Sequence, residues 1–176
     1  MPHALQNYWT DPYPPLFPGR ALNRHTRFTA RRMRIPGDVS GADSVLCWQT
    51  GFPFAVNLQR GYPRYNPGEF TANDMLERGE VDACLLVGSE AVRELSSAAV
   101  ESLRTILVIA LDSPHFEPAL AAAIQFRTAV YGVHASGTAY RMDEIPIPLR
   151  SFLPTKLSND ADVLSAIRRA IFGGSR

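Results

Sequence analysis

Lysine is almost absent from this sequence of 176 residues: Lys156 is the only one, and arginine supplies the remaining basic side chains. With 18 basic and 17 acidic residues, the formal net charge is +1. Six arginines gather between Arg20 and Arg34, but the rest of the chain adds no basic surface and no known nucleic-acid module. We therefore expect no nucleic acid partner.

Arginine's planar guanidinium group makes bidentate contacts with carboxylates and phosphates. The cluster between Arg20 and Arg34 is consistent with a solvated or salt-bridged protein surface. It is also consistent with a surface that faces a phosphate or a pterin. Both interpretations stay open at this point.

Long apolar runs are also missing. No stretch approaches the roughly 18 apolar residues that would span a bilayer, and the N-terminus lacks the charged-then-apolar order of a signal peptide. We expect no membrane partner and a cytoplasmic protein.

Cysteine occurs only twice, as Cys47 and Cys84, both in apolar runs that are typical of strands. Buried free thiols are the expected state, in preference to a disulfide or a metal-binding pair. The four histidines have no ligand spacing with one another or with the cysteines, so no metal site is predicted.

Several catalytic and nucleotide-binding motifs are absent from the sequence. There is no Gly-x-x-x-x-Gly-Lys, no Gly-x-Gly-x-x-Gly and no serine nucleophile elbow. No pair of residues stands out as a nucleophile and its base. We therefore predict no catalytic residue in this chain.

The most distinctive stretch is Gly61-Tyr62-Pro63-Arg64-Tyr65-Asn66-Pro67-Gly68-Glu69. Each proline restricts the residue before it to extended backbone, which predicts an ordered loop. Aromatic residues and arginine are enriched at protein interfaces. This loop and the aromatic passage before it predict an interface that comprises Trp48, Phe52, Arg60, Tyr62, Arg64, Tyr65 and Asn66.

Residues 1–20 hold five prolines and no apolar periodicity, which predicts an extended or poorly ordered arm. Residues 21–176 are expected to form a single α/β domain. A short strand-like pattern covers residues 26–34. After it, the patterns predict strands at 44–49, 81–88, 105–111 and about 128–134, and helices at 69–78, 89–103, about 118–124 and 159 or 160 to 172. This alternation favours a three-layer sandwich with a mostly parallel sheet.

Ligands of parallel sheets collect where the strands end. Gly88 and Ser89 join a strand to a helix N-terminus, which favours an anion. Asp112 follows the next strand, where it is expected either to accept hydrogen bonds from a ligand or to cap a helix. Gly137 and Thr138 follow the last strand.

Three segments carry a family resemblance. They are residues 48–56, residues 60–69 followed by Arg78-Gly79-Glu80-Val81-Asp82-Ala83, and residues 137–143 followed by Ile145-Pro146-Ile147-Pro148-Leu149-Arg150. In this order they resemble the B subunit of formylmethanofuran dehydrogenase and the homologous subunit of the bacterial formyltransferase/hydrolase complex. The resemblance covers roughly residues 26–172.

The resemblance implies a molybdopterin-oxidoreductase fold. It further implies that a molybdopterin guanine dinucleotide would lie near Gly88, Ser89, Asp112, Gly137, Thr138 and Arg34. The family subunit is more than twice as long as this chain, which matches its C-terminal portion. The residue that binds molybdenum or tungsten would lie in the missing N-terminal part, so the chain is expected to be inactive alone.

By resemblance, we expect a scaffold subunit of a complex in tetrahydromethanopterin-linked formyl metabolism. Its partners would be the other subunits of that complex. One alternative is half of a split molybdopterin oxidoreductase that completes its metal site with another chain. The other is a standalone α/β module that binds an anion or a nucleotide.

Overall fold

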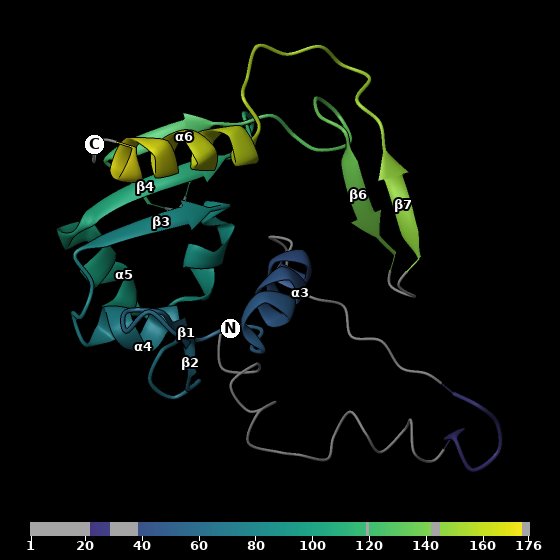
Figure 1. Cartoon of the computed structure of the whole chain (residues 1–176), viewed down its shortest axis with the longest axis horizontal. Helices are drawn as coiled ribbons and strands as arrows, with labels where there is room; N and C mark the ends of the chain where they lie inside the picture. The colour runs from purple at the N-terminus through teal and green to yellow at the C-terminus, as the bar shows by residue number, and fades with distance from the viewer. Residues whose placement is uncertain (1–21, 29–38, 119, 142–144, 174–176) are drawn as a thin grey trace. The chain divides into compact units, whose positions relative to one another are not determined.

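A computed structural model describes residues 22–28, 39–118, 120–141 and 145–173 (Figure 1). The chain forms two compact units, one of residues 1–33 with 142–144 and one of residues 34–141 with 145–176. In the first unit, residues 22–28 form a turn in which the Asn23 side chain donates to and accepts from the Phe28 backbone. The predicted arm over residues 1–20 lies outside the described residues.

The second unit is built on a parallel sheet of three strands, β3 (Ala83–Val87), β4 (Leu107–Asp112) and β5 (Ile124–Arg127). The strands lie in the order β3-β4-β5, and the register places Leu85 beside Ile109 and Ile109 beside Ile124. The predicted α/β class with a parallel sheet is confirmed. Two apolar runs of strand length carried that prediction.

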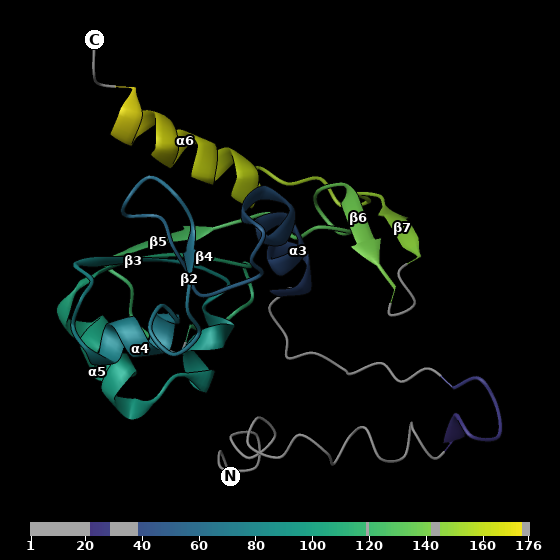
Figure 2. The same ribbon diagram turned by 60° about the horizontal axis from the view of Figure 1, so that its bottom comes forward.

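Five helices accompany the sheet in the described residues: α3 (Val39–Thr50), α4 (Ala72–Glu77), the 3₁₀ helix η1 (Ser89–Glu94), α5 (Ser97–Thr105) and α6 (Asp160–Phe172). Figure 2 shows α6 on one side of the sheet, and α4 and α5 on the other. The core lies between the sheet and α4, η1 and α5. It is formed by Leu76, Val92, Ala99, Leu103, Val108 and Leu120.

Side-chain caps define where three of the helices begin. Thr71, Ser96 and Asn159 each accept a hydrogen bond from a backbone N–H in the first turn of α4, α5 and α6. Such a cap satisfies one of the amides that has no partner inside the helix. Of the two starts expected for the last helix, Asp160 is the first residue of α6, and Asn159 is its cap, since Asn159 Oδ1 accepts from the Asp162 N–H at 2.8 Å.

Two antiparallel hairpins complete the unit. One joins β1 (Val56–Asn57) to β2 (Arg64–Tyr65), and the other joins β6 (Gly137–Tyr140) to β7 (Pro146–Leu149). The second hairpin was not predicted, because two of the four residues of β7 are prolines. Proline is tolerated only in edge strands, and β7 pairs on one side with β6.

Several predicted elements were wrong. Residues 44–49 belong to helix α3 and not to a strand, since a short apolar run does not distinguish the two. The helix predicted over residues 89–103 is divided, because Leu95 is extended and Ser96 caps a new helix.

The segment between β4 and the last hairpin also differs from the prediction. The described residues of 118–124 contain no helix. The strand predicted at 128–134 lies instead at Ile124–Arg127, and a turn follows it. The strand-like pattern at 26–34 has its described part, residues 26–28, in a bend and coil; the rest lies outside the described residues.

The structure corrects the expectation that both cysteines are buried. Both are free thiols, as predicted, but Cys47 is exposed on α3 and only Cys84 is partly buried. Burial raises the pKa of the Cys84 thiol above its ordinary value. Cys47 is exposed because its segment forms a helix and not a buried strand.

Candidate functional site

Strands β3 and β4 end side by side, and their ends bring Gly88, Ser89 and Asp112 together. Gly88 has a φ of 77°, the left-handed conformation that glycine adopts most readily, and it turns the chain from β3 into η1. The Ser89 N–H then donates to Asp112 Oδ1 at 2.7 Å, and Ser89 Oγ donates to Oδ2 at 3.0 Å. The two residues are 1% and 2% exposed.

The Asp112 carboxylate has a further partner on β5. Gln125 Nε2 donates to Oδ2 at 3.2 Å, and the Thr128 N–H donates to the Asp112 main-chain oxygen at 2.9 Å. Both carboxylate oxygens are therefore engaged within the chain. Asp112 thereby holds Ser89, the first residue of η1, in place, and its contact with a ligand stays a prediction.

A shallow pocket of about 200 Å³ opens beside this network. Its wall includes three carboxylates, from Glu90, Asp112 and Asp160, together with Gly88 and Tyr131. Asp160 Oδ1 is buried and has no hydrogen-bond partner among the described residues. Because both Asp112 oxygens are already engaged, the carboxylates left to accept hydrogen bonds from a ligand are those of Glu90 and Asp160.

Gly137 lies next to Tyr131, which lines this pocket. A Cβ atom at Gly137 would stand 3.2 Å from Tyr131 Cδ1, and Tyr131 lines the pocket. The neighbouring Thr138 is exposed and pairs with Pro148 across the hairpin. Arg34 lies outside the described residues.

The structure thus brings three of the predicted site residues together and places Gly137 nearby. Contact of any of them with a cofactor stays a prediction. Sequence reasoning missed Asp160 and Tyr131 as pocket residues. Asp160 was considered only as a residue at the start of a helix, and no motif linked that helix to the ends of the strands.

Two of the predicted interface residues, Phe52 and Tyr65, form an aromatic stack at the hairpin of β1 and β2. The rings of Phe52 and Tyr65 are 4.9 Å apart and nearly parallel, at 5°. Phe54 meets Tyr65 edge-on, at 5.8 Å and 76°. The Arg64 guanidinium lies 4.8 Å from the centre of the Phe70 ring.

Asn66 ties the loop after β2 to its surroundings. Its N–H donates to the Ala55 oxygen at 3.3 Å, its side chain donates to Glu69 Oε2 at 3.0 Å, and its Oδ1 accepts from the Gly68 N–H at 3.3 Å. Side-chain hydrogen bonds of this kind are how asparagine fixes a turn. The loop has the local bonding expected of an ordered segment.

Much of the predicted interface faces solvent in the isolated chain. Trp48 is 74% exposed and Tyr62 is 52% exposed, and Arg60 is exposed as well. Arg64 is partly buried, yet its Nε atom has no hydrogen-bond partner among the described residues. A buried donor without an acceptor is costly, and the buried Nε is not accessible to a partner, so only the accessible part of the Arg64 side chain is available for contact.

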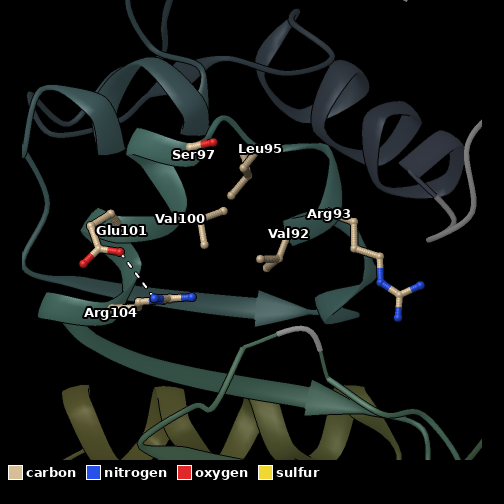
Figure 3. Close-up of a pocket in the computed structure, with 7 residues that line it drawn as sticks. All are labelled: Val92, Arg93, Leu95, Ser97, Val100, Glu101 and Arg104. Atoms are coloured by element: carbon tan, nitrogen blue, oxygen red, sulfur yellow. Dashed lines mark ion pairs between the residues drawn. The ribbon is translucent and has the colours of Figure 1, made fainter. Parts of the chain in front are cut away.

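A second hollow, of about 410 Å³, lies between η1 and α5 (Figure 3). Its lining combines three aliphatic residues with four polar or charged ones, and its two oppositely charged side chains on α5 pair with each other, since Arg104 lies 3.4 Å from Glu101. Figure 3 shows Arg93 pointing away from this pair. The hollow brings no polar groups together on a common point, so it is not a candidate site.

Two absences hold for the part of the chain that the structure describes. No group of three or more histidine, cysteine, aspartate or glutamate side chains is placed to hold a metal ion. Among the same residues, no helix has the length and apolar character needed to cross a membrane.

Comparison with known proteins gives two curated relatives. The chain is 41% identical over 153 residues to the B subunit of the tungsten-containing formylmethanofuran dehydrogenase 2 from Methanocaldococcus jannaschii. It is 37% identical over 153 residues to the same subunit from Methanococcus maripaludis. Each match covers 85% of this chain and 35% of the relative.

The fold is also similar to that of a solved structure, the formyltransferase/hydrolase complex (FhcABCD) from Methylorubrum extorquens in complex with methylofuran. The TM-score is 0.70 at 25% sequence identity, over 89% of this chain and 44% of that one. No family model matches the chain. The chain is thus similar in sequence to the B subunit of formylmethanofuran dehydrogenase and in fold to a chain of the formyltransferase/hydrolase complex, and it spans about a third of the length of the curated relatives it matches.

Proposed function

We propose that the chain is a non-catalytic component of a protein complex in one-carbon metabolism, in the place of a dehydrogenase B subunit. The complex would resemble formylmethanofuran dehydrogenase or the formyltransferase/hydrolase complex. The observation that carries this proposal is the 41% identity over 153 residues to the B subunit of a dehydrogenase. The similarity to a chain of a formyltransferase/hydrolase complex supports it independently.

A scaffolding role agrees with the chemistry of the described residues. Acyl transfer needs a nucleophile with a base within hydrogen-bond reach and donors for an oxyanion. The Ser89 hydroxyl does lie 3.0 Å from the Asp112 carboxylate, but the two residues are buried at 1% and 2% exposure, so an acyl substrate would not reach that hydroxyl. The formyl group would be transferred by other subunits of the complex.

The finer fold that we propose is a three-layer, molybdopterin-oxidoreductase-like sandwich. Helices on both sides of the parallel sheet support it (Figure 2). The resemblance of the residues around the sheet to the B subunit of formylmethanofuran dehydrogenase also supports this fold.

A molybdopterin guanine dinucleotide does not fit the pocket of the described residues. Drug-sized ligands occupy pockets of about 300–1,000 Å³, whereas this pocket has about 200 Å³. Its three carboxylates would also repel the pyrophosphate of the cofactor. The pocket suits a small uncharged group that donates hydrogen bonds. A larger ligand would also have to be bound by residues of another polypeptide.

The aromatic hairpin is the surface that we propose for contact with other subunits. Exposed aromatic side chains next to arginine are typical of binding hot spots. Trp48 and Tyr62 are exposed, and Arg64 Nε has no acceptor in the described part of the chain. A carboxylate or carbonyl oxygen of a partner would contact the accessible part of the Arg64 side chain, which is only partly buried.

Affinity purification from the cells that naturally make this protein tests the proposal. The tagged chain is captured at native expression level, and the proteins that accompany it are identified by mass spectrometry. We expect a formyltransferase-type and an amidohydrolase-type subunit in comparable amounts. Recovery of the chain without either would contradict the proposed role.

The unpartnered Asp160 oxygen favours one alternative, a chain that binds a molybdopterin cofactor jointly with another polypeptide. The same purified sample distinguishes it. Tungsten or molybdenum together with guanine nucleotide, in amounts that match the protein, would support this alternative. A complex with partners and without these components would support the scaffold.

A further inference from the structure

The loop of the β1–β2 hairpin and the residues that flank it present apolar side chains to solvent. Leu58 and Tyr62, in the loop between the two strands, are 54% and 52% exposed. Phe54 and Tyr65 are 42% and 38% exposed, and their rings meet edge-on at 5.8 Å. The four side chains come from one short segment, and exposed apolar groups that gather in this way are typical of a binding surface.

Hydrogen bonds inside the loop hold it in one conformation. The Gly61 N–H donates to the Leu58 oxygen at 2.9 Å, and Gly61 has a φ of 80°, which glycine adopts readily. The Gln59 N–H donates to Asn57 Oδ1 at 2.9 Å. A loop that is ordered before binding loses less conformational entropy when a partner binds to it.

Ala55, which directly precedes β1, has a strained backbone. Its φ is 50°, and among the described residues it is the only one other than glycine with a positive φ. A side chain makes this conformation unfavourable, and such strain is concentrated at functional sites. The Ala55 oxygen accepts from the Asn66 N–H at 3.3 Å, so the strained residue joins the two ends of the hairpin. The backbone therefore indicates a functional hairpin independently of its exposed side chains.

The charges of this segment all have one sign. Between Ser44 and Glu69, the only charged residues are Arg60 and Arg64. In the part of the chain that the structure describes, neither arginine pairs with a carboxylate, since the ion pairs found there involve other arginines. Glu69 is the nearest acidic residue along the chain, and its carboxylate accepts from the Asn66 side chain. The positive charge of the hairpin is thus not neutralised by these neighbours.

The two arginines differ in how they are held. Arg64 is partly buried, and its guanidinium lies 4.8 Å from the centre of the Phe70 ring. Arg60 is exposed in the loop, beside Leu58 and Tyr62 in the sequence. A guanidinium group forms its strongest hydrogen bonds with a carboxylate or a phosphate. Arginine next to exposed aromatic side chains is the combination found at binding hot spots.

We propose that the hairpin surface, defined as Phe54, Leu58, Arg60, Tyr62 and Tyr65, binds an acidic segment of a partner subunit. An aspartate or glutamate of that segment would contact Arg60, and its apolar side chains would lie on Leu58 and Tyr62. Complementary charge of this kind selects the partner and speeds association. The proposal rests on the proposed function and adds to it the chemistry of the partner.

A nucleic acid is a poorer match for this surface. Its binding depends on many phosphate contacts, whereas the segment offers two arginines, of which one is partly buried, in a chain of net charge +1. An acidic polypeptide needs only a few such contacts, and its apolar residues also use the exposed rings.

The near absence of lysine gives a direct test. A carbodiimide joins a lysine amine to a carboxylate that touches it, with loss of water, and Lys156 is the only lysine in the chain. Arg60→Lys places an amine on the hairpin surface and keeps the positive charge. In the complex captured from the cells that naturally make this protein, we expect an amide cross-link between position 60 and an aspartate or glutamate of a partner subunit. Mass spectrometry of the cross-linked peptides identifies that residue.

Arg168→Lys is the matched control, because Arg168 is exposed on α6, outside the hairpin surface. We expect it to give no cross-link to the same partner segment. A captured complex in which Arg60→Lys forms no cross-link to a partner subunit would overturn the proposal. A cross-link from position 60 only to this chain, or to a second copy of it, would overturn it as well.

Charge reversal gives an independent measurement. Arg60→Glu should lower recovery of the partner subunits at least about tenfold, and salt at about 1 M, where the Debye length is about 3 Å, should lower recovery by the wild-type chain. Because Arg60 is exposed, the circular dichroism spectrum and the melting temperature should stay unchanged.

Equal recovery with Arg60→Glu and Arg168→Glu would overturn the proposal, as would a nucleic acid in place of the partner subunit. These failures leave recovery of the partner subunits by the wild-type chain unchanged. Failure of the proposed function instead appears as a wild-type chain that recovers no partner subunit, which would overturn this proposal too.

Discussion

Replacing Asp112 tests whether the network at the ends of the strands supports the fold. Asp112→Ala removes the acceptor of the Ser89 N–H at 2.7 Å and of Ser89 Oγ at 3.0 Å, and Ser89 is 1% exposed. A buried donor left without a partner costs about 1–3 kcal/mol. The Ser89 hydroxyl can rotate to another acceptor, and the Gln125 amide can donate to water because Gln125 is exposed. These two groups therefore add little to the cost, and we expect the free energy of unfolding to fall by about 3 kcal/mol in total.

Urea unfolding followed by circular dichroism measures this loss. With an m-value of about 2 kcal/mol/M for a small protein, the midpoint should fall by about 1.5 M. Asp112→Asn keeps one acceptor and should cost about 1 kcal/mol. Ser113→Ala, at the exposed neighbour, should stay within about 0.5 kcal/mol.

A double mutant separates the network from other effects of burial. Ser89→Ala and Asp112→Ala share partners, so their combined cost should be at least about 0.5 kcal/mol smaller than the sum of the single costs. An Asp112→Ala midpoint that matches Ser113→Ala would refute the reasoning. Strictly additive costs would show that Ser89 and Asp112 do not act together.

Two further predictions concern α6 and the cysteines. Asn159→Ala should lower the free energy of unfolding by about 1 kcal/mol because it removes the N-cap of α6. Asp160→Ala should lower it by less. Chemical denaturation measures both losses, and a larger loss for Asp160→Ala than for Asn159→Ala would contradict this prediction. Cys84 is partly buried and its pKa is raised by burial, whereas Cys47 is exposed. In the native protein, Cys84 should therefore react with a disulfide reagent at least about tenfold more slowly than Cys47. Variants that keep only one of the two cysteines allow each rate to be measured separately. Equal rates would mean that β3 opens readily and would contradict the prediction.

Strands β3 and β4 could be predicted from the sequence because they are short, continuous apolar runs, whereas β5, with Gln125 and Arg127 among its four residues, was predicted too far along the chain. Helix α6 could be predicted because its apolar residues recur with helical spacing and because Asn159 and Asp160 mark its start. Helix α3 could not, since the run from Ser44 to Gln49 is compatible with either structure. The β6–β7 hairpin was concealed by Pro146 and Pro148, which are unusual in strands.

The candidate site was predictable only where the topology determined it. The ends of adjacent parallel strands meet, so Gly88, Ser89 and Asp112 had to lie close together. That the Asp112 carboxylate is fully engaged within the chain depends on Gln125, which no motif marked. The part that Asp160 and Tyr131 play in the pocket depends on how the last helix and the turn after β5 pack.

The central claim is that this chain acts through other subunits, which it contacts with the aromatic hairpin. Arg64→Ala tests it most directly, with partner recovery and melting temperature measured on the same preparations. Within the chain, the variant loses the contact with the Phe70 ring at 4.8 Å, worth about 0.5–1 kcal/mol.

We expect the melting temperature to fall by no more than about 4 °C, while recovery of the partner subunits falls at least about tenfold, as at a binding hot spot. Arg104→Ala, at an exposed arginine on α5, should change neither quantity appreciably. Unchanged recovery with Arg64→Ala, or a loss of recovery fully matched by a loss of thermal stability, would contradict the account.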